Sequence, residues 1–439
     1  MMTYYLQNAL RGIKRSPGLS LLVVAAIAIG IGVSITMLTV YHLMSSNPVP
    51  EKSEQLFRVQ VDSWDPLRPF DDDRPERAPH QMTWRDAMAI LEQAPAPRQV
   101  AMFEALVIIQ PPDAQQLPFE ATTRMANGDF FPMFNVPFLY GGGWSRHEDE
   151  AATQVAVLSR TLNDKLYGGD NSVGKKLVIN DRVFTITGVM NSWSPVPRFY
   201  DVINSPFQEV SEIFLPVALT PGMEMRSAGS DWGWKAERIN TFEDWLASES
   251  AWLQFWAELP TSADQRTYLS FLDAYANEQK LLGRFQRPIN NHIHDVMAWM
   301  AYMEVVEEDV AVLVGLGFLF LLVCLLSSVA LLLTKFNGMS AEMSLRRALG
   351  ATRMQIVGQN LTEVSIIGLT GGVFGLLFTM LSLYGIKSMI SRVPDALFRL
   401  DGTMIAAAIG LSVLAAVLAG LYPAIRACTL TPAQQLKTQ

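Results

Sequence analysis

The sequence carries little charge for its length. Of its 439 residues, 17% are Asp, Glu, Lys or Arg, whereas soluble proteins usually contain about 25%. It has only two cysteines, Cys324 and Cys428, and both lie within or at the end of apolar runs. No disulfide can therefore join distant parts of the polar region, which is long enough to form a core without one. The missing charge indicates that part of the chain is membrane-embedded.

Four apolar runs are long enough to cross a hydrocarbon core, which requires about 18 residues or more. We expect transmembrane helices at residues 19–44, 310–334, 356–386 and 403–423. The third run begins with Gln359, Asn360 and Glu363, so its first turns are expected at the interface or against protein. The first run resembles a signal peptide but continues to Val40, which favours an uncleaved anchor.

Basic residues gather at one side of these runs. The bases near the first run, between the second and third runs, and in the tail are Arg11, Lys14, Arg15, Lys335, Arg346, Arg347, Arg353, Arg426 and Lys437, against the single acid Glu342. Since Lys and Arg accumulate in cytoplasmic segments, we expect both termini and residues 335–355 and 424–439 inside. Of 34 bases and 42 acids, 25 bases and 41 acids remain elsewhere, which gives the outside a net charge of −16.

Residues 45–309 are predicted to form a large α+β extracytoplasmic domain inserted between the first and second spans. Strand patterns occur at Leu56–Val61, Val155–Leu158, Lys176–Ile179 and Val183–Val189, and helical patterns at Thr83–Gln93, Thr161–Tyr167, Thr241–Ala257 and Ser262–Phe285. Residues 223–256 are rich in tryptophan and are expected to form an inserted subdomain. Residues 290–308 are predicted to be a helical stalk, 387–402 a short outer loop, and 1–18 an amphipathic interfacial helix.

Two segments mimic sites of chemistry. Gly169–Lys176 comes within one residue of a phosphate-binding loop, but Lys176 replaces the required Ser or Thr and a strand is predicted to follow. His292 and His294 suggest metal ligands, but no third ligand is apparent and residues two apart do not share a helix face. An exposed polar helix is the alternative interpretation of this segment. We therefore expect no catalytic, cofactor or metal site, and no nucleic-acid partner.

Small residues recur at a spacing of four in the apolar runs, which allows close approach of helix backbones. The glycines predicted to pack helices, within this chain or against a second copy, are Gly30, Gly368, Gly371, Gly372, Gly375 and Gly420.

The segment 335–355 between the second and third runs reads as a basic amphipathic helix. Leu345, Leu349 and Ile356 fall on one stripe, and Arg346 and Arg353, seven residues apart, project from one flank. Such a helix either lies on anionic lipid or docks a soluble partner, and the pattern alone favours neither.

Several segments resemble the FtsX-like permease and the MacB-type periplasmic core families. The FtsX-like matches are Glu342–Arg353 with Glu363, and Gly420–Ala427 with Leu430–Pro432; the MacB-type matches are Gly128–Phe131, His147–Glu150, Val155–Ser159, Leu166–Asp170, Val173–Lys175 and Ile186–Val189. Ala9–Arg11 and Ser16–Gly18 add to the resemblance. MacB itself carries a fused ATPase domain that this sequence lacks, and residues 196–286 match no motif.

The resemblance implies the permease subunit of a bacterial inner-membrane ABC transporter, with ATP and Mg bound by a separate cytoplasmic ATPase. It implies a second permease copy or homologue, and possible partnership with a periplasmic adaptor and an outer-membrane channel. The residues that would couple to the ATPase are Glu342, Leu345, Arg346, Arg347, Leu349, Gly350, Arg353 and Ile356. Mechanotransmission for efflux of antimicrobial peptides or drugs is the expected role; the alternatives are lipoprotein release of the Lol type and control of a cell-wall hydrolase.

Overall fold

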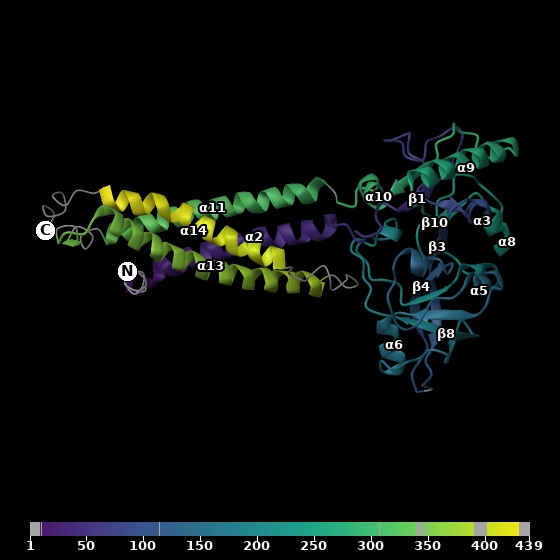
Figure 1. The fold of residues 1–439 in the computed structure, drawn as a ribbon, viewed down its shortest axis with the longest axis horizontal. Helices are drawn as coiled ribbons and strands as arrows, with labels where there is room; N and C mark the ends of the chain where they lie inside the picture. Colours follow the sequence, from purple (N-terminus) through teal and green to yellow (C-terminus); the bar gives the residue numbers. More distant parts are fainter. Residues whose placement is uncertain are drawn as a thin grey trace. The chain divides into compact units, whose positions relative to one another are not determined.

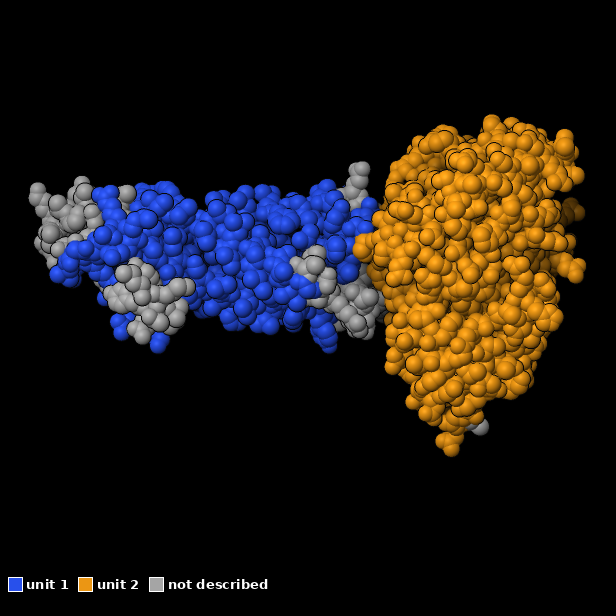
Figure 2. Space-filling model, viewed as in Figure 1, with its two compact units in different colours: residues 1–45, 306–439 blue, residues 46–305 orange. Residues whose placement is uncertain are grey.

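A computed structural model describes residues 9, 11–113, 115–306, 308–339, 345–346, 349–389 and 402–429. The chain forms two compact units, residues 1–45 with 306–439, and residues 46–305, coloured blue and orange in Figure 2. Described residues 9 and 11–15 of the first unit are helical.

The first unit contains four helices that are long and apolar enough to cross a membrane: α2 (Pro17–Ser45), α11 (Glu308–Gly338), α13 (Arg353–Met389) and α14 (Gly402–Thr429). They run alongside one another in Figure 1. The core of this bundle contains Val23, Ile27, Ile31 and Ile35 from one face of α2. α2 is central, since half of its most apolar window is buried, against 17% for α11.

The glycines predicted to pack helices lie at contacts within this chain. Gly30 of α2 faces Leu321 and Cys324 of α11, where an added Cβ would come within 3.0 Å of both side chains. Gly371 and Gly375 of α13 lie against α2, next to Ile27 and Ile31 respectively.

The α13–α14 contact uses the remaining three glycines. A Cβ on Gly368 would overlap Ala416, one on Gly372 would meet Ser412 Oγ at 2.5 Å, and one on Gly420 would overlap Val364. The close approach of these two helices therefore depends on the missing side chains.

The second unit is built on an eleven-stranded mixed sheet among the described residues. Its order is β11-β1-β10-β3-β4-β9-β6-β8-β5, with β2 paired to β10 and β7 paired to β3 and β8. The strands are β1 (Leu56–Gln60), β2 (Met82–Thr83), β3 (Arg98–Gln110), β4 (Phe119–Ala126), β5 (Phe138–Gly141), β6 (Val155–Leu158), β7 (Lys176–Ile179), β8 (Arg182–Met190), β9 (Ile213–Pro216), β10 (Ala251–Glu258) and β11 (His292–Asp295).

Helices pack on the sheet and connect its strands. They are α3 (Trp84–Gln93), α4 (Phe130–Met133), α5 (Arg146–Glu150), α6 (Arg160–Tyr167), α7 (Thr220–Met223), α8 (Phe242–Ala247), α9 (Ser262–Leu281) and α10 (Val296–Tyr302), with 3₁₀ turns η1 (Phe199–Asp201) and η2 (Val217–Leu219). Polar residues fix their starts; for example, Thr261 and Asp264 form a capping box at α9.

Alternate residues of the central strands belong to two separate hydrophobic cores. In β3, Phe103 and Ala105 join one core, whereas Val100 and Met102 join the other, as the period of two along a strand requires. In the first core, Tyr268 and Leu272 of α9 are buried. The second core is aromatic, and its members include Phe130, Phe131, Phe134, Tyr200, Trp256 and Trp299.

The strands that enter and leave this unit are neighbours. β1, the first strand after α2, pairs antiparallel with β11, and Val59 lies opposite Ile293. β11 leads into α10 and then to α11. The two chain segments that connect this unit to the helices of the first unit therefore meet in one ladder.

The predicted fold class is confirmed: four apolar helices accompany a large mixed domain that follows the first of them. The helical prediction for Thr241–Ala257 is wrong over its second half. α8 ends at Ala247 and Ala251–Glu258 is the buried strand β10, paired with β1 and β3. Every residue of β10 is buried, and a strand buried on both faces shows no alternation to reveal it.

Two further predictions for this unit are wrong. The tryptophan-rich segment 223–256 is not a separate subdomain, because Trp252 and Trp256 are fully buried in the cores and β10 lies inside the sheet. Residues 290–308 are not one helical stalk: β11 and α10 occupy residues 292–302, and turn residues follow.

Candidate functional site

The described part of the predicted coupling segment presents two large apolar side chains. Leu345 is 62% exposed and Leu349 is 80% exposed. Arg346 donates a hydrogen bond to Gln359 Oε1 of α13 at 2.7 Å, which ties this segment to the bundle. Arg353, at the start of α13, is exposed. Glu342 and Arg347, also predicted here, lie outside the described residues.

The prediction of a continuous helix through Leu345–Ile356 is wrong. Gly350 has a φ of +99°, a left-handed conformation that ends a helix and that glycine adopts without a steric cost. Thr352 then caps α13: its Oγ1 accepts the Gln355 amide at 3.3 Å, and Gln355 Oε1 accepts the Thr352 amide at 2.9 Å. Leu345 and Leu349 therefore do not share a helix with Ile356.

Ile356 also has a different role from the one predicted. It is 4% exposed and belongs to the core of the bundle, so it cannot supply an anchor for a partner protein. Leu345, Leu349 and Met354, which is 81% exposed, are the apolar side chains that remain accessible in the described part of this segment.

A buried ion pair lies near this segment, inside the bundle. Lys335 of α11 contacts Glu363 of α13, and their side chains are 0% and 1% exposed. Lys335 Nζ also donates to Ser20 Oγ of α2 at 2.7 Å. The Lys335 ammonium group thus links three helices at a buried position, where an unpaired charge would cost solvation energy.

The helical stretch before α2 closes over the same carboxylate. A Cβ on Gly12 would fall within 3 Å of all three atoms of the Glu363 carboxyl group, so the missing side chain leaves room for it. This cluster was not predicted from the sequence, where Lys335 is one of the basic residues expected on the cytoplasmic side. The available signal was one charge of each sign at the same end of two neighbouring apolar runs.

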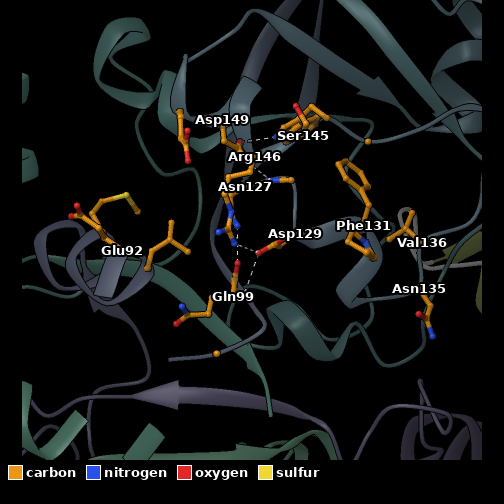
Figure 3. A pocket seen from close by; sticks show the side chains of 18 of the residues that line it. Glu92, Gln99, Asn127, Asp129, Phe131, Asn135, Val136, Ser145, Arg146 and Asp149 are labelled. Atoms are coloured by element: carbon orange, nitrogen blue, oxygen red, sulfur yellow. Dashed lines mark hydrogen bonds and ion pairs between the residues drawn. The ribbon is translucent and has the colours of Figure 1, made fainter. Parts of the chain in front are cut away.

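The second unit contains an open cleft of about 990 Å³. It is lined by α3, the start of β3, the turn before α4, α4 itself and α5. In Figure 3, Glu92 of α3 and Phe131 of α4 lie on opposite sides, with Asp129 and Arg146 between them. This volume falls at the upper end of the range for small-molecule pockets, about 300–1,000 Å³.

Asp149 organises one wall of the cleft. Its carboxylate accepts the Gly128 amide at 2.6 Å and the Trp144 indole N–H at 2.7 Å. A Cβ on Gly128 would overlap the Trp144 backbone, so glycine is needed for this approach. Burial raises the pKa of Asp149 to about 6, against the opposing effect of these hydrogen bonds.

The two segments that mimic chemical sites have other local structures. Gly169–Lys176 leads into β7, and the hydroxyl of Ser172 is used internally, donating to Asn163 Oδ1 at 2.5 Å. His292 and His294 lie on strand β11, not on the polar helix expected as the alternative. No group of three potential metal ligands occurs within the part of the chain that the structure describes.

Comparisons with known proteins agree with these features. Residues 20–263 match the MacB-like periplasmic core domain family, and residues 314–432 match the FtsX-like permease C-terminal family. The chain belongs to the ABC transporter permeases that combine these two domains. It is a membrane permease with four apolar helices and a large extracellular domain, and its family implies an ATPase partner within the transporter.

Two Bacillus subtilis proteins are similar over most of their length. "Uncharacterized ABC transporter permease YvrN" is 20% identical over 70% of this chain and 68% of its own, and "Uncharacterized ABC transporter permease YknZ" is 20% identical over 72% and 70%. The "Pyoverdine export ATP-binding/permease protein PvdT" of Pseudomonas aeruginosa is 33% identical over 64 residues, 15% of this chain and 10% of its own.

Two solved structures are similar to part of this chain. The periplasmic region of MacB from Actinobacillus actinomycetemcomitans is 12% identical with a TM-score of 0.36, and the alignment covers 58% of this chain and 95% of that one. The extracellular domain of YknZ from Gram-positive bacteria is 9% identical with a TM-score of 0.33, covering 54% of this chain and 99% of that one.

Proposed function

We propose that this chain couples ATP hydrolysis by a separate cytoplasmic ATPase to movement of its extracytoplasmic domain. The observation that carries the proposal is the path of the chain between two sites. α2 and α11 are joined at one end by the Ser20–Lys335–Glu363 cluster. Beyond its other end, α2 is followed by residues 46–55 and then β1, and α11 is preceded in the chain by α10 and the turn at residues 303–306. Displacement of these helices is thereby delivered to the β1–β11 ladder.

The docking site for the ATPase is the segment around Leu345–Arg353. Exposed Leu345 and Leu349 supply apolar contact, and Arg346 and Arg353 supply charge. Apolar anchors generally carry most of the binding energy of an interface, and peripheral charges carry less. The excess of Lys and Arg on this side supports a cytoplasmic location for it in a bacterial inner membrane.

The work done by the moving domain is export of a substrate already outside the inner membrane. The local similarity to a protein named for pyoverdine export supports a role in export. A second permease copy or homologue, a periplasmic adaptor and an outer-membrane channel would complete such a machine. Antimicrobial peptides or drugs are the substrate class that we propose, and ATP and Mg would be bound by the ATPase alone.

Co-purification tests the coupling. The purified chain alone should hydrolyse no ATP, and the complex captured from the native membrane should hydrolyse it. Reversing Arg346 and Arg353 together to Glu should abolish substrate-stimulated hydrolysis while leaving the chain folded. Arg11→Glu/Lys14→Glu is the control, because it makes the same charge change at exposed positions before α2. Full stimulation in Arg346→Glu/Arg353→Glu would exclude this docking site.

Deletion of the gene separates the export function from its alternatives. Selective sensitivity to cationic peptides or macrolides is the expected phenotype. Lipoproteins retained in the inner membrane would instead indicate release of the Lol type, and chaining or lysis would indicate control of a cell-wall hydrolase.

A further inference from the structure

The cleft between α3 and α5 combines an apolar lining with charge of mainly one sign. Met88 and Leu91 of α3 lie on one side, and Phe131, Val136 and Trp144 lie around α4 and before α5. Phe131 and Trp144 pack edge to face with their ring centroids 4.9 Å apart. Because Phe131 and Trp144 are themselves nearly buried, the partly exposed side chains of Met88, Leu91 and Phe138 supply the apolar surface of the cleft.

The charged groups at the cleft are four acids and one base. The acids are Glu92, Asp129, Asp149 and Glu150, and the base is Arg146. Arg146 lies 3.7 Å from Asp129, and its side chain is 74% exposed, so solvent screens this pair. No ion pair or side-chain hydrogen bond to Glu92 or Glu150 occurs among the residues that the structure describes.

The cleft is built before any ligand arrives. Asp149 holds the Gly128 amide and the Trp144 indole through both of its oxygens, and Asn127 bridges to β3 by accepting the Ala101 amide at 3.0 Å and donating to Gln99 O at 2.7 Å. A pre-formed wall lowers the ordering cost of binding. Asp149 is thus a positioning group, Asp129 is shared between Arg146 and the Gln99 amide, and Glu92 and Glu150 are left to face a ligand.

We propose that this cleft binds a cationic amphiphile the size of a short peptide, with its apolar part against the partly exposed Met88, Leu91 and Phe138 and its positive charge toward Glu92 and Glu150. This inference rests on the proposed export function, for which it gives the place of substrate contact. The five charged lining groups sum to a negative charge, which attracts cations and repels anions of otherwise equal shape. The tryptophans of β10, being buried in the cores, cannot serve this purpose.

The test measures binding to the full chain in phosphatidylcholine nanodiscs, with no nucleotide or ATPase present. The probe is an octapeptide amide of alternating lysine and leucine with a neutral fluorophore, followed by fluorescence polarisation against empty discs. Glu92→Gln/Glu150→Gln should weaken binding by about five-fold, as expected from two exposed charge interactions. A counterpart peptide with glutamate in place of lysine should not bind.

The matched control is Glu120→Gln/Glu278→Gln. These two glutamates are exposed on β4 and α9, outside the cleft, so the change in net charge is the same. The control should bind the probe as the native chain does. Equal weakening in both double variants would show attraction by the whole acidic domain, and no weakening in Glu92→Gln/Glu150→Gln would overturn the proposal.

Covalent capture provides a second, independent measurement. In a Cys324→Ala/Cys428→Ser background, Glu150→Cys should react faster than Glu278→Cys with the same peptide carrying a bromoacetyl group. Equal rates would place the peptide elsewhere. Neither measurement involves ATP. A chain that fails to bind the probe would therefore not contradict the proposed coupling to an ATPase. Full stimulation of hydrolysis in Arg346→Glu/Arg353→Glu would likewise not contradict peptide binding in the cleft.

Discussion

The Lys335–Glu363 pair is the most deeply buried charged contact of the membrane unit among the described residues. Burial of two charges costs solvation energy that their attraction repays only while both are present. Ser20 satisfies one further ammonium proton. The pair is therefore expected to specify how α2, α11 and α13 fit together more than to add net stability.

Removal of one partner should be worse than removal of both. Glu363→Gln leaves Lys335 buried without a counter-charge, and we expect a loss of about 3 kcal/mol or more in unfolding free energy. Lys335→Met/Glu363→Gln should recover much of that loss. Unfolding by a denaturing detergent in mixed micelles measures both. Additive losses in the double variant would show that the two side chains do not interact.

Asp149 predicts a pH dependence of stability with a definite sign. Its pKa is raised from 3.8 to about 6, chiefly by burial, with Asp129 and Glu148 contributing repulsion. The folded state thus binds this proton more tightly than the unfolded state. Its contribution to stability is present below pH 4, and it is lost as the pH rises through 6.

Comparison with Asp149→Asn isolates this effect from other titrating groups. Relative to the variant, the native chain should gain on the order of 1 kcal/mol between pH 7 and pH 5. Thermal melts across this range, taken as native minus variant, measure the difference. A difference that falls on acidification would show that the hydrogen bonds from Gly128 and Trp144 outweigh burial.

At the scale of elements, α13 and α14 depend on glycine for their contact. Gly368→Leu should place a branched side chain where Ala416 already lies, and overpacking of this kind costs about 1–3 kcal/mol. Gly410→Leu is the control on α14, where nothing lies within 4 Å of an added Cβ. Detergent unfolding should separate the two variants. Equal stability would mean that the helices separate at little cost.

Elements were predicted correctly where only one kind of structure explains the residue pattern. The four membrane helices follow from the need to avoid charge over the length of a hydrocarbon core. β10 was missed because a strand buried on both faces shows no alternation, so periodicity alone does not distinguish it from a buried helix. The break at Gly350 was missed because a lone glycine does not reveal its φ.

The candidate sites were less predictable than the fold. Leu345, Leu349 and Ile356 were predicted to share one face, but the burial of Ile356 depends on the packing of α13 against α2 and α14. The cleft joins Glu92 to Glu150 across 58 positions of sequence. No local pattern encodes such proximity, because tertiary packing creates it.

At the scale of the whole molecule, the β1–β11 ladder is predicted to stay paired during function. A disulfide between Val59→Cys and Ile293→Cys, which lie opposite each other, should form in a background without native cysteines, since directly opposed antiparallel residues have Cα atoms about 4.5–5.5 Å apart, within the range that a disulfide spans. ATP hydrolysis and export by the oxidised complex should equal those of the reduced complex. Loss of export that a reductant restores would show that the two strands must separate.

That ladder determines what kind of force the outer domain can receive. A domain held at two distant points can be stretched, and work is then lost in deforming its interior. Here the incoming and outgoing segments attach at the same end of two adjacent antiparallel strands, so a force passed along both segments enters the sheet at one place. Under the proposed coupling the rest of the sheet would move with these two strands, so loops and clefts elsewhere in the domain could change in the course of evolution without altering the point at which force is applied.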